Sequence, residues 1–191
     1  LERGKSTIFF SATLLPVNYY KNLLSSKKDN YAVYADSAFR EEQRLLFIGR
    51  DVSSLYTRRT LGEFHRIALY IQQVLRAKKG NYLIFFPSYR FMEDVYEQFL
   101  AVNEQEADCM MQSGNMNEAD REEFIQEFSN PRGKSLAAFC VLGGIFSEGI
   151  DLRDKSLIGA CIVGTGIPMI CRKRNILRNY FDSIGKNGYQ Y

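Results

Sequence analysis

The chain has 191 residues, of which 46% are hydrophobic and 25% charged, proportions typical of one globular domain and unlike those of a disordered chain. Its net charge of +3, from 25 basic and 22 acidic residues, neither requires nor excludes a nucleic-acid partner. No apolar run approaches the roughly 20 residues of a transmembrane helix, and residues 1–5 do not resemble a secretory signal, so we expect no membrane partner and a cytoplasmic location.

Short apolar runs alternate with amphipathic stretches along the chain. The apolar runs predict six strands, at Thr7–Phe10, Leu45–Ile48, Tyr82–Phe86, Asp108–Met111, Leu136–Leu142 and Leu157–Val163. Several of these runs are apolar throughout instead of alternating, as is typical of strands that are covered on both faces in a parallel sheet.

Four helices are predicted between and after these strands. Apolar residues recur every three or four positions over residues 61–78 and again after the third strand, at Met92, Val95 and Phe99. Asn117 is a good N-cap for a third helix, which Asn130-Pro131 would end. The inner face of this helix would hold Phe124, Ile125 and Phe128. A last helix should follow Pro168 and bury Leu177, Tyr180, Phe181 and Ile184.

Strands that alternate with helices predict an α/β fold, namely an open, mainly parallel sheet with helices on both faces. In such sheets the functional residues gather in loops at the carboxyl ends of the strands. The candidate loops are Ser11–Pro16, Gly49–Arg59, Pro87–Arg90, Ser113–Asn117, Gly143–Asp151 and Gly164–Pro168.

The loop Gly143–Leu152 (GGIFSEGIDL) carries the most chemistry. Its glycines permit sharp turns or close approach to a ligand, while Ser147, Glu148 and Asp151 add a hydroxyl and two carboxylates. Such a loop can hold a phosphate, a ribose hydroxyl or an arginine from a facing domain. On composition alone, an ordinary turn with a helix-capping acid is an equally good interpretation.

GGIFSEGIDL closely resembles motif V of the DinG/XPD-like branch of superfamily 2 helicases. Phe10–Pro16 (FSATLLP) resembles motif III of that family and Phe85–Tyr89 (FFPSY) resembles motif IV, in the family's order. Asp51–Arg59 and Gly164–Arg178 also resemble stretches of these proteins. The resemblance runs from about residue 7 to about residue 185, and it implies the second RecA-like motor domain of an ATP-dependent DNA helicase.

The resemblance also implies roles around ATP. Ser11 and Thr13 of motif III would be the catalytic coupling residues, which link ATP hydrolysis to DNA movement. Gly149 and Asp151 of motif V would border the nucleotide. The chain contains no Walker A lysine and no acidic Walker B motif, so ATP and Mg²⁺ would be held mostly by a first motor domain, which is an expected partner.

A single-stranded DNA partner is implied by the same resemblance, in a setting of DNA repair or of unusual DNA structures. The residues expected to bind the DNA are Ser88, Tyr89, Arg58, Arg59, Ser147 and Glu148. Hydroxyls, loop N–H groups and arginines hold phosphates without reading bases. Tyr89 and Tyr56 suit stacking on bases and half-buried packing equally well. The basic cluster at residues 172–178 suits a solvated helix face or phosphate contact.

Domain boundaries follow from the order of these motifs. We expect residues 1–20 to be the end of the first motor domain and residues 21–191 to be the second domain, cut before motif VI, which the family places after the last helix. The chain alone is therefore expected to hydrolyse no ATP. An iron–sulfur cluster, found in part of the family, would belong to the first motor domain only.

No metal site is predicted in this chain. Its four cysteines, Cys109, Cys140, Cys161 and Cys171, form no C-x-x-C pair and lie at no zinc spacing from His65, the single histidine. Three of them fall in predicted strands, and we expect reduced, buried, structural thiols. A packing or surface role is expected for His65.

Three other functions fit parts of the sequence. A helicase-linked nuclease of the same branch would carry an appended nuclease domain. A non-catalytic α/β interaction module would share the motor fold, although the polar residues of the Gly143–Leu152 loop argue against decay of a motor. A small-molecule enzyme on a flavodoxin-like sheet lacks a nucleophile–base pair and a glycine-rich cofactor fingerprint.

Overall fold

The computed structural model describes residues 4–11, 14–25, 30–37, 39–147, 150–166 and 171–188. The chain divides into two compact units, Leu1–Phe47 and Ile48–Tyr191. Within the first unit lie helix α1 (Val17–Leu24), which has no buried residue, and the short 3₁₀ helix η1 (Glu41–Gln43). The predicted boundary between the first and the second motor domain, at residues 20 and 21, stays a prediction.

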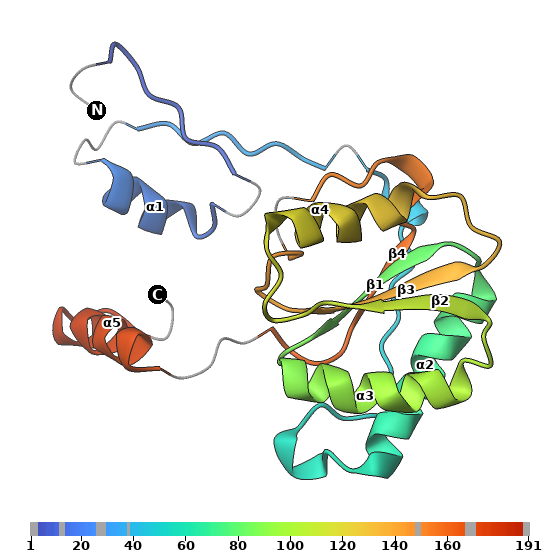
Figure 1. The fold of residues 1–191 in the computed structure, drawn as a ribbon. Coiled ribbons are helices and arrows are strands. Elements are labelled where there is room, and N and C mark those ends of the chain that lie inside the picture. Colours follow the sequence, from blue (N-terminus) through green and yellow to red (C-terminus); the bar gives the residue numbers. More distant parts are fainter. Residues whose placement is uncertain are drawn as a thin grey trace. The chain divides into compact units, whose positions relative to one another are not determined.

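The described part of the second unit is built on a four-stranded sheet in the order β2-β3-β1-β4 (Figure 1). The strands are β1 (Asn81–Phe86), β2 (Ala107–Met111), β3 (Ser135–Val141) and β4 (Gly159–Ile162). All three pairings are parallel. The carboxyl ends of the four strands therefore meet along one edge of the sheet, which we call the carboxyl edge. These strands confirm four of the six predicted strands, with small shifts at their ends.

Helices cover both faces of this sheet. Figure 1 shows α2 (Leu61–Ala77) and α3 (Tyr89–Val102) on one face and α4 (Glu118–Gln126) on the other. Each of the three starts with a side-chain cap, from Thr60, Ser88 and Asn117 respectively. The predicted N-cap at Asn117 is confirmed, and the helical path ends at Asn130 after the 3₁₀ helix η3 (Glu127–Ser129). The predicted α/β class is confirmed.

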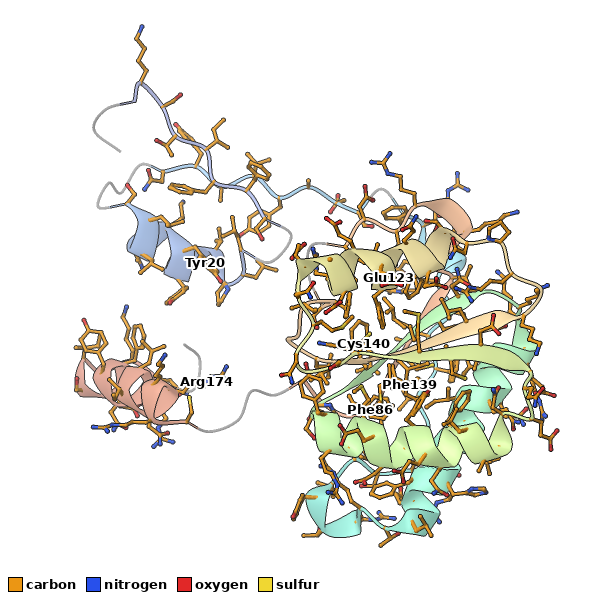
Figure 2. The ribbon with its side chains drawn as sticks, in the orientation of Figure 1. Tyr20, Phe86, Glu123, Phe139, Cys140 and Arg174 are labelled. Carbon is orange, nitrogen blue, oxygen red and sulfur yellow. The ribbon has the colours of Figure 1, made fainter. Side chains whose placement is uncertain are left out.

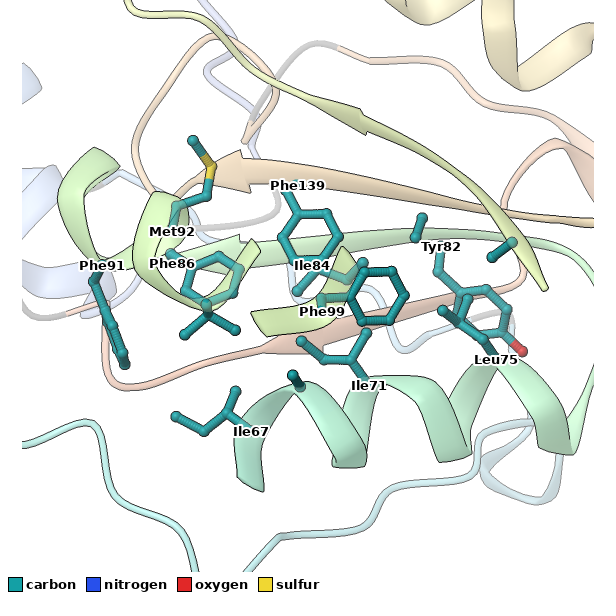
Figure 3. Packing of buried hydrophobic residues seen from close by; sticks show 14 of the residues in the cluster. Ile67, Ile71, Leu75, Tyr82, Ile84, Phe86, Phe91, Met92, Phe99 and Phe139 are labelled. Atoms are coloured by element: carbon teal, nitrogen blue, oxygen red, sulfur yellow. The ribbon is translucent and has the colours of Figure 1, made fainter. Parts of the chain in front are cut away.

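The core consists of two apolar layers, one on each face of the sheet. On the α2 and α3 side, Phe86 stacks on Phe139 with ring centroids 5.8 Å apart, next to Phe91 at the start of α3 (Figure 3). Successive strand residues point to opposite faces, so Cys140 lies in the other layer (Figure 2). Phe124 of α4 belongs to the same layer as Cys140. Burial on both faces explains why these strands are apolar throughout.

Two predicted strands are wrong. Thr7–Phe10 and Leu45–Ile48 form no strand, and their large apolar side chains are exposed, among them Phe10 at 91% and Leu45 at 87%. An apolar run indicates side chains that favour burial, but a strand also needs a neighbouring strand to pair with. The residues that the structure describes supply no such neighbour for either run.

The last helix forms, but its predicted burial is wrong. α5 (Arg172–Ser183) has no buried residue, and Leu177, Tyr180 and Ile184 are exposed, while Phe181 is half-buried. Its predicted start after Pro168 lies outside the described residues. Helical spacing of apolar residues predicts which face would be buried, but not what covers that face.

Candidate functional site

Gln112 joins three strand-end loops at the carboxyl edge. It directly follows β2, and its side chain is 2% exposed. Its Nε2 donates to the hydroxyl oxygen of Tyr89, after β1, at 3.0 Å. Its Oε1 accepts from the backbone N–H of Val141, the last residue of β3, at 3.0 Å. One buried amide therefore fixes Tyr89 relative to the end of β3.

The loop after β3, residues 143–147, is a tight turn that requires glycine twice. Gly143 has φ +71°, which L-residues with a side chain rarely adopt. A Cβ on Gly144 would lie 2.9 Å from the carbonyl oxygen of Val141 and 3.0 Å from Nε2 of Gln112. The hydroxyl of Ser147 donates to the Val141 carbonyl at 3.2 Å. This 143–147 loop is therefore held against the strand end and against Gln112.

A second segment, residues 51–59, is anchored beside the same edge. Gly164, after β4, has φ +103°, and a Cβ there would lie 2.9 Å from the Cβ and Oγ of Ser54. At the start of the segment, the hydroxyl of Tyr70 in α2 donates to the Asp51 carboxylate. This hydrogen bond lowers the pKa of Asp51. The 51–59 segment thus packs between the end of β4 and helix α2.

Glu63 is the buried anchor of this 51–59 segment. Its carboxylate, 2% exposed, accepts hydrogen bonds from the backbone N–H of Ser53 and from the guanidinium of Arg66. Burial by itself raises the pKa of a carboxyl group. Here the two hydrogen bonds and the charges of Arg66 and Arg58 outweigh burial, and the pKa of Glu63 lies below its ordinary value of 4.5. Glu63 therefore stays ionised and holds the segment in place.

The side chain of Arg59 packs against the first turn of α3, next to Ser88 and Tyr89. Its Nε donates to the carbonyl of Ser54 at 3.2 Å, and its Cζ lies 4.1 Å from the ring centroid of Phe91. The backbone N–H of Phe91 donates in turn to Oγ of Ser88 at 3.4 Å. The hydrogen bond to Ser54 uses one of the five N–H donors of Arg59.

The structure thus brings four of the predicted site residues to the carboxyl edge: Ser88, Tyr89, Arg59 and Ser147. Arg58 is exposed in the 3₁₀ helix η2 (Tyr56–Arg58), within electrostatic reach of Glu63. The exposed Asp151 accepts two hydrogen bonds from Arg153, at 2.8 and 2.9 Å. Ser11 is exposed in the first unit.

Three other predicted residues, Thr13, Glu148 and Gly149, lie outside the described residues. The functional roles of all ten predicted site residues stay predictions.

Sequence reasoning missed Gln112 and Glu63. The signal for Gln112 was a polar residue placed directly after a predicted strand, where loop chemistry begins. Thr60 and Glu63 have the spacing of a capping box, which marks a helix start. Thr60 does cap α2 through the N–H of Glu63. The carboxylate of Glu63, however, binds Ser53 and Arg66 instead of closing the box.

The cysteines bear out the prediction of structural thiols in part. Cys140 is buried in its strand, whereas Cys109 and Cys161 are half-buried in theirs. Burial raises the pKa of these thiols, to about 12 for Cys140 and about 11 for the other two. Cys171 is exposed, so its predicted burial is wrong. His65 is exposed on α2. In the described ranges, no group of three or more His, Cys, Asp or Glu is placed to hold a metal ion.

Comparison with known proteins gives the class of this chain. A family model described as a helicase C-terminal domain matches residues 71–191. The chain therefore belongs to the helicase C-terminal domain family.

Within the described part of the chain, no helix has both the length and the apolar character needed to cross a membrane.

Individual relatives show which helicases the chain is similar to. The chain is 29% identical over 170 residues to the ATP-dependent DNA helicase XPD of Sulfolobus acidocaldarius, and the match covers 85% of this chain and 28% of that protein. Two solved structures, described as apo XPD and as XPD helicase, superpose with TM-scores of 0.51 and 0.53 at 24% identity. They cover 68% and 69% of this chain, which spans 25% and 22% of theirs.

These matches confirm the predicted RecA-like α/β fold and the resemblance to DinG/XPD-like helicases. The chain is thus a member of the helicase C-terminal domain family that is similar to XPD helicases, and it spans about a quarter of the length of the relatives that it matches.

Proposed function

We propose that this chain is the second motor domain of an ATP-dependent DNA helicase that translocates on single-stranded DNA. ATP hydrolysis at the interface with a first motor domain would open and close the two domains, and each cycle would move the DNA by a small step. The observation that carries this proposal is the gathering of Ser88, Tyr89, Arg59 and Ser147 at one edge of the sheet, in a chain of the helicase family.

The chemistry of the carboxyl edge supports binding of a nucleic-acid backbone. The oxygen of Ser88 accepts a hydrogen bond from the N–H of Phe91, so the hydroxyl proton of Ser88 can be donated to a phosphate. Arg59 adds a positive charge whose guanidinium is oriented by Phe91 and Ser54. These groups recognise phosphates and not bases, which supports sequence-tolerant binding.

The loop after β3 supports a partial nucleotide site. The exposed carboxylate of Asp151 can accept hydrogen bonds from ribose hydroxyls, and its Arg153 partner also lies at the surface, so exchange of partners is inexpensive. When bound, ATP would supply the phosphoanhydride whose hydrolysis drives movement. This chain contains neither Walker motif, so the phosphates and Mg²⁺ would be held mainly by the first motor domain. The chain alone should hydrolyse no ATP.

The DNA part of the proposal is tested with the purified chain. Fluorescence anisotropy would follow binding of labelled single-stranded oligo-dT and oligo-dA at increasing NaCl concentrations. We expect similar affinities for the two oligonucleotides and a steep loss of affinity with salt, because released counterions accompany each phosphate contact. Absence of binding at low salt, or binding that salt does not weaken, would overturn the proposed DNA path.

A further inference from the structure

We propose that Gln112 is a positioning residue that orients the hydroxyl of Tyr89 as a hydrogen-bond donor toward a phosphodiester oxygen of bound DNA. The inference rests on the proposed function, which supplies the DNA. It adds a direction to one contact: Tyr89 would hold the backbone through its O–H, and not a base through its ring. Gln112 itself, 2% exposed, would touch no DNA.

The backbone of β3 fixes the orientation of the Gln112 amide. The group that faces Gln112 from β3 is the N–H of Val141, which can only donate. The amide atom 3.0 Å from it must therefore be the acceptor Oε1. The amino group Nε2 then points the other way, to the oxygen of Tyr89 at 3.0 Å. A flipped amide would place two donors against each other.

This orientation decides what the Tyr89 hydroxyl can do. Because Nε2 can only donate, the Tyr89 oxygen is the acceptor in this bond. The single hydroxyl proton therefore has to be donated elsewhere, and Tyr89 is 36% exposed. The free proton matches a ligand whose facing atom only accepts, and a phosphodiester oxygen is such an atom.

The surroundings of the Tyr89 ring hold it in place. Gly114, in the loop after β2, lies next to the ring, so that a Cβ added there would lie 3.7 Å from Cζ of Tyr89. On the same helix turn, the guanidinium of Arg59 lies over the ring of Phe91. The first turn of a helix is its positive end, which also favours an anion. The hydroxyl donor, the arginine and the helix start together present positive charge and donors to one phosphate chain.

Two substitutions in the full chain test the direction of the hydrogen bond. Tyr89→Phe keeps the ring and removes the hydroxyl, so we expect about tenfold weaker binding of both oligo-dT and oligo-dA, the usual loss for a hydrogen bond to a charged group. Gln112→Glu keeps an acceptor for Val141, but its second oxygen would accept the Tyr89 proton. We expect Gln112→Glu also to weaken binding about tenfold.

A double-mutant cycle separates this effect from the added charge of the glutamate. In the Tyr89→Phe background no hydroxyl remains to be redirected, so Gln112→Glu should cost several-fold less there than in the wild type. Gln112→Met, which cannot accept the proton, should bind better than Gln112→Glu. Wild-type affinity of Tyr89→Phe, or an equal cost of Gln112→Glu in both backgrounds, would overturn the inference. Thermal unfolding of each variant would establish that it is folded.

Two measurements distinguish the loss of the proposed DNA path from the loss of the positioning role of Gln112. If the wild-type chain binds no single-stranded DNA, the proposed DNA path is overturned, and the phosphodiester contact with it. The hydrogen bond from the Val141 N–H to Gln112, which orients the amide of Gln112, is tested without DNA by hydrogen exchange of the Val141 amide. Loss of one hydrogen bond in Gln112→Met should speed this exchange by at least about fivefold. Unchanged exchange would overturn the positioning role even if the wild type binds DNA.

Discussion

The carboxylate of Glu63 accepts a hydrogen bond from the backbone N–H of Ser53, ten residues earlier in the chain. The same carboxylate pairs with Arg66 and is almost fully buried. This arrangement joins the first turn of α2 to the segment that carries Arg58 and Arg59. The placement of two predicted DNA-binding arginines therefore depends on a carboxylate that need not touch DNA.

Glu63→Gln should destabilise the chain in a pH-dependent manner. The pKa of Glu63 in the folded chain lies below its ordinary value of 4.5, so its ionised form stabilises the fold fully above that value. The stabilisation disappears as pH falls through the lowered pKa. At pH 7 we expect the variant to unfold about 2–4 °C lower, the shift that loss of about 1 kcal/mol causes in a domain of this size.

Thermal unfolding followed by circular dichroism between pH 3 and pH 7 would measure this effect. The gap between wild type and Glu63→Gln should narrow as the pH falls below about 4.5. Glu97→Gln, an exposed substitution on α3, is the matched control and should show no gap. A gap for Glu63→Gln that stays constant down to pH 3 would contradict the role of its charge.

Gly144→Ala should destabilise the fold because the new methyl group has no room. Its Cβ would lie 2.9 Å from the Val141 carbonyl oxygen, a backbone atom that cannot easily move. We expect a loss of about 1–3 kcal/mol in the free energy of unfolding, measured by urea titration. Gly62→Ala in α2, where nothing lies within 4 Å of the added carbon, should keep or raise stability. Equal stabilities for the two variants would be inconsistent with close packing at Gly144.

Arg59→Leu should weaken DNA binding in a salt-dependent way. If Arg59 contacts one phosphate, its loss should reduce the slope of log affinity against log salt concentration by about 1. Lys79→Leu removes the same charge from an exposed residue just before β1, at the opposite edge of the sheet, and should leave the slope unchanged. Equal slopes for wild type and Arg59→Leu, measured by anisotropy, would remove Arg59 from the DNA path.

The cysteines should react with thiol reagents in a fixed order. Cys171 is exposed, whereas burial raises the pKa of Cys140 to about 12. The thiolate is the reactive form, so at pH 7 maleimide should label Cys171 first and Cys140 only after unfolding. Mass spectrometry of tryptic peptides at increasing labelling times would measure the order. Early labelling of Cys140 would show that β3 is less protected than its burial implies.

Sequence patterns predicted the sheet where burial is complete. The runs that became β1 and β3 are apolar because helices cover both of their faces, and the cap at Asn117 is a local signal of helix start. Thr7–Phe10 and Leu45–Ile48 are equally apolar but form no strand, because pairing depends on neighbours that are distant in sequence. Local patterns thus identify candidates for burial and not the partners that bury them.

The candidate site was predicted unevenly for the same reason. Ser88, Tyr89 and Ser147 were found because motif order placed them after strands. Gln112 was not found, since its importance comes from Val141 and Tyr89, which are far from it in the chain. A single glutamine after a strand has no special spacing, and only the fold shows that it joins three loops.

We propose that this chain forms one of the two domains of an ATP-driven motor on single-stranded DNA. The most direct test is the ATPase rate of a protein that joins this chain to its first motor domain, measured with and without single-stranded DNA. We predict DNA-stimulated hydrolysis that Ser147→Ala and Asp151→Asn each lower at least about tenfold, while the chain alone hydrolyses none. An ATPase rate that DNA does not raise and that both variants leave unchanged would contradict this proposal. No hydrolysis in the joined protein would favour a non-catalytic module.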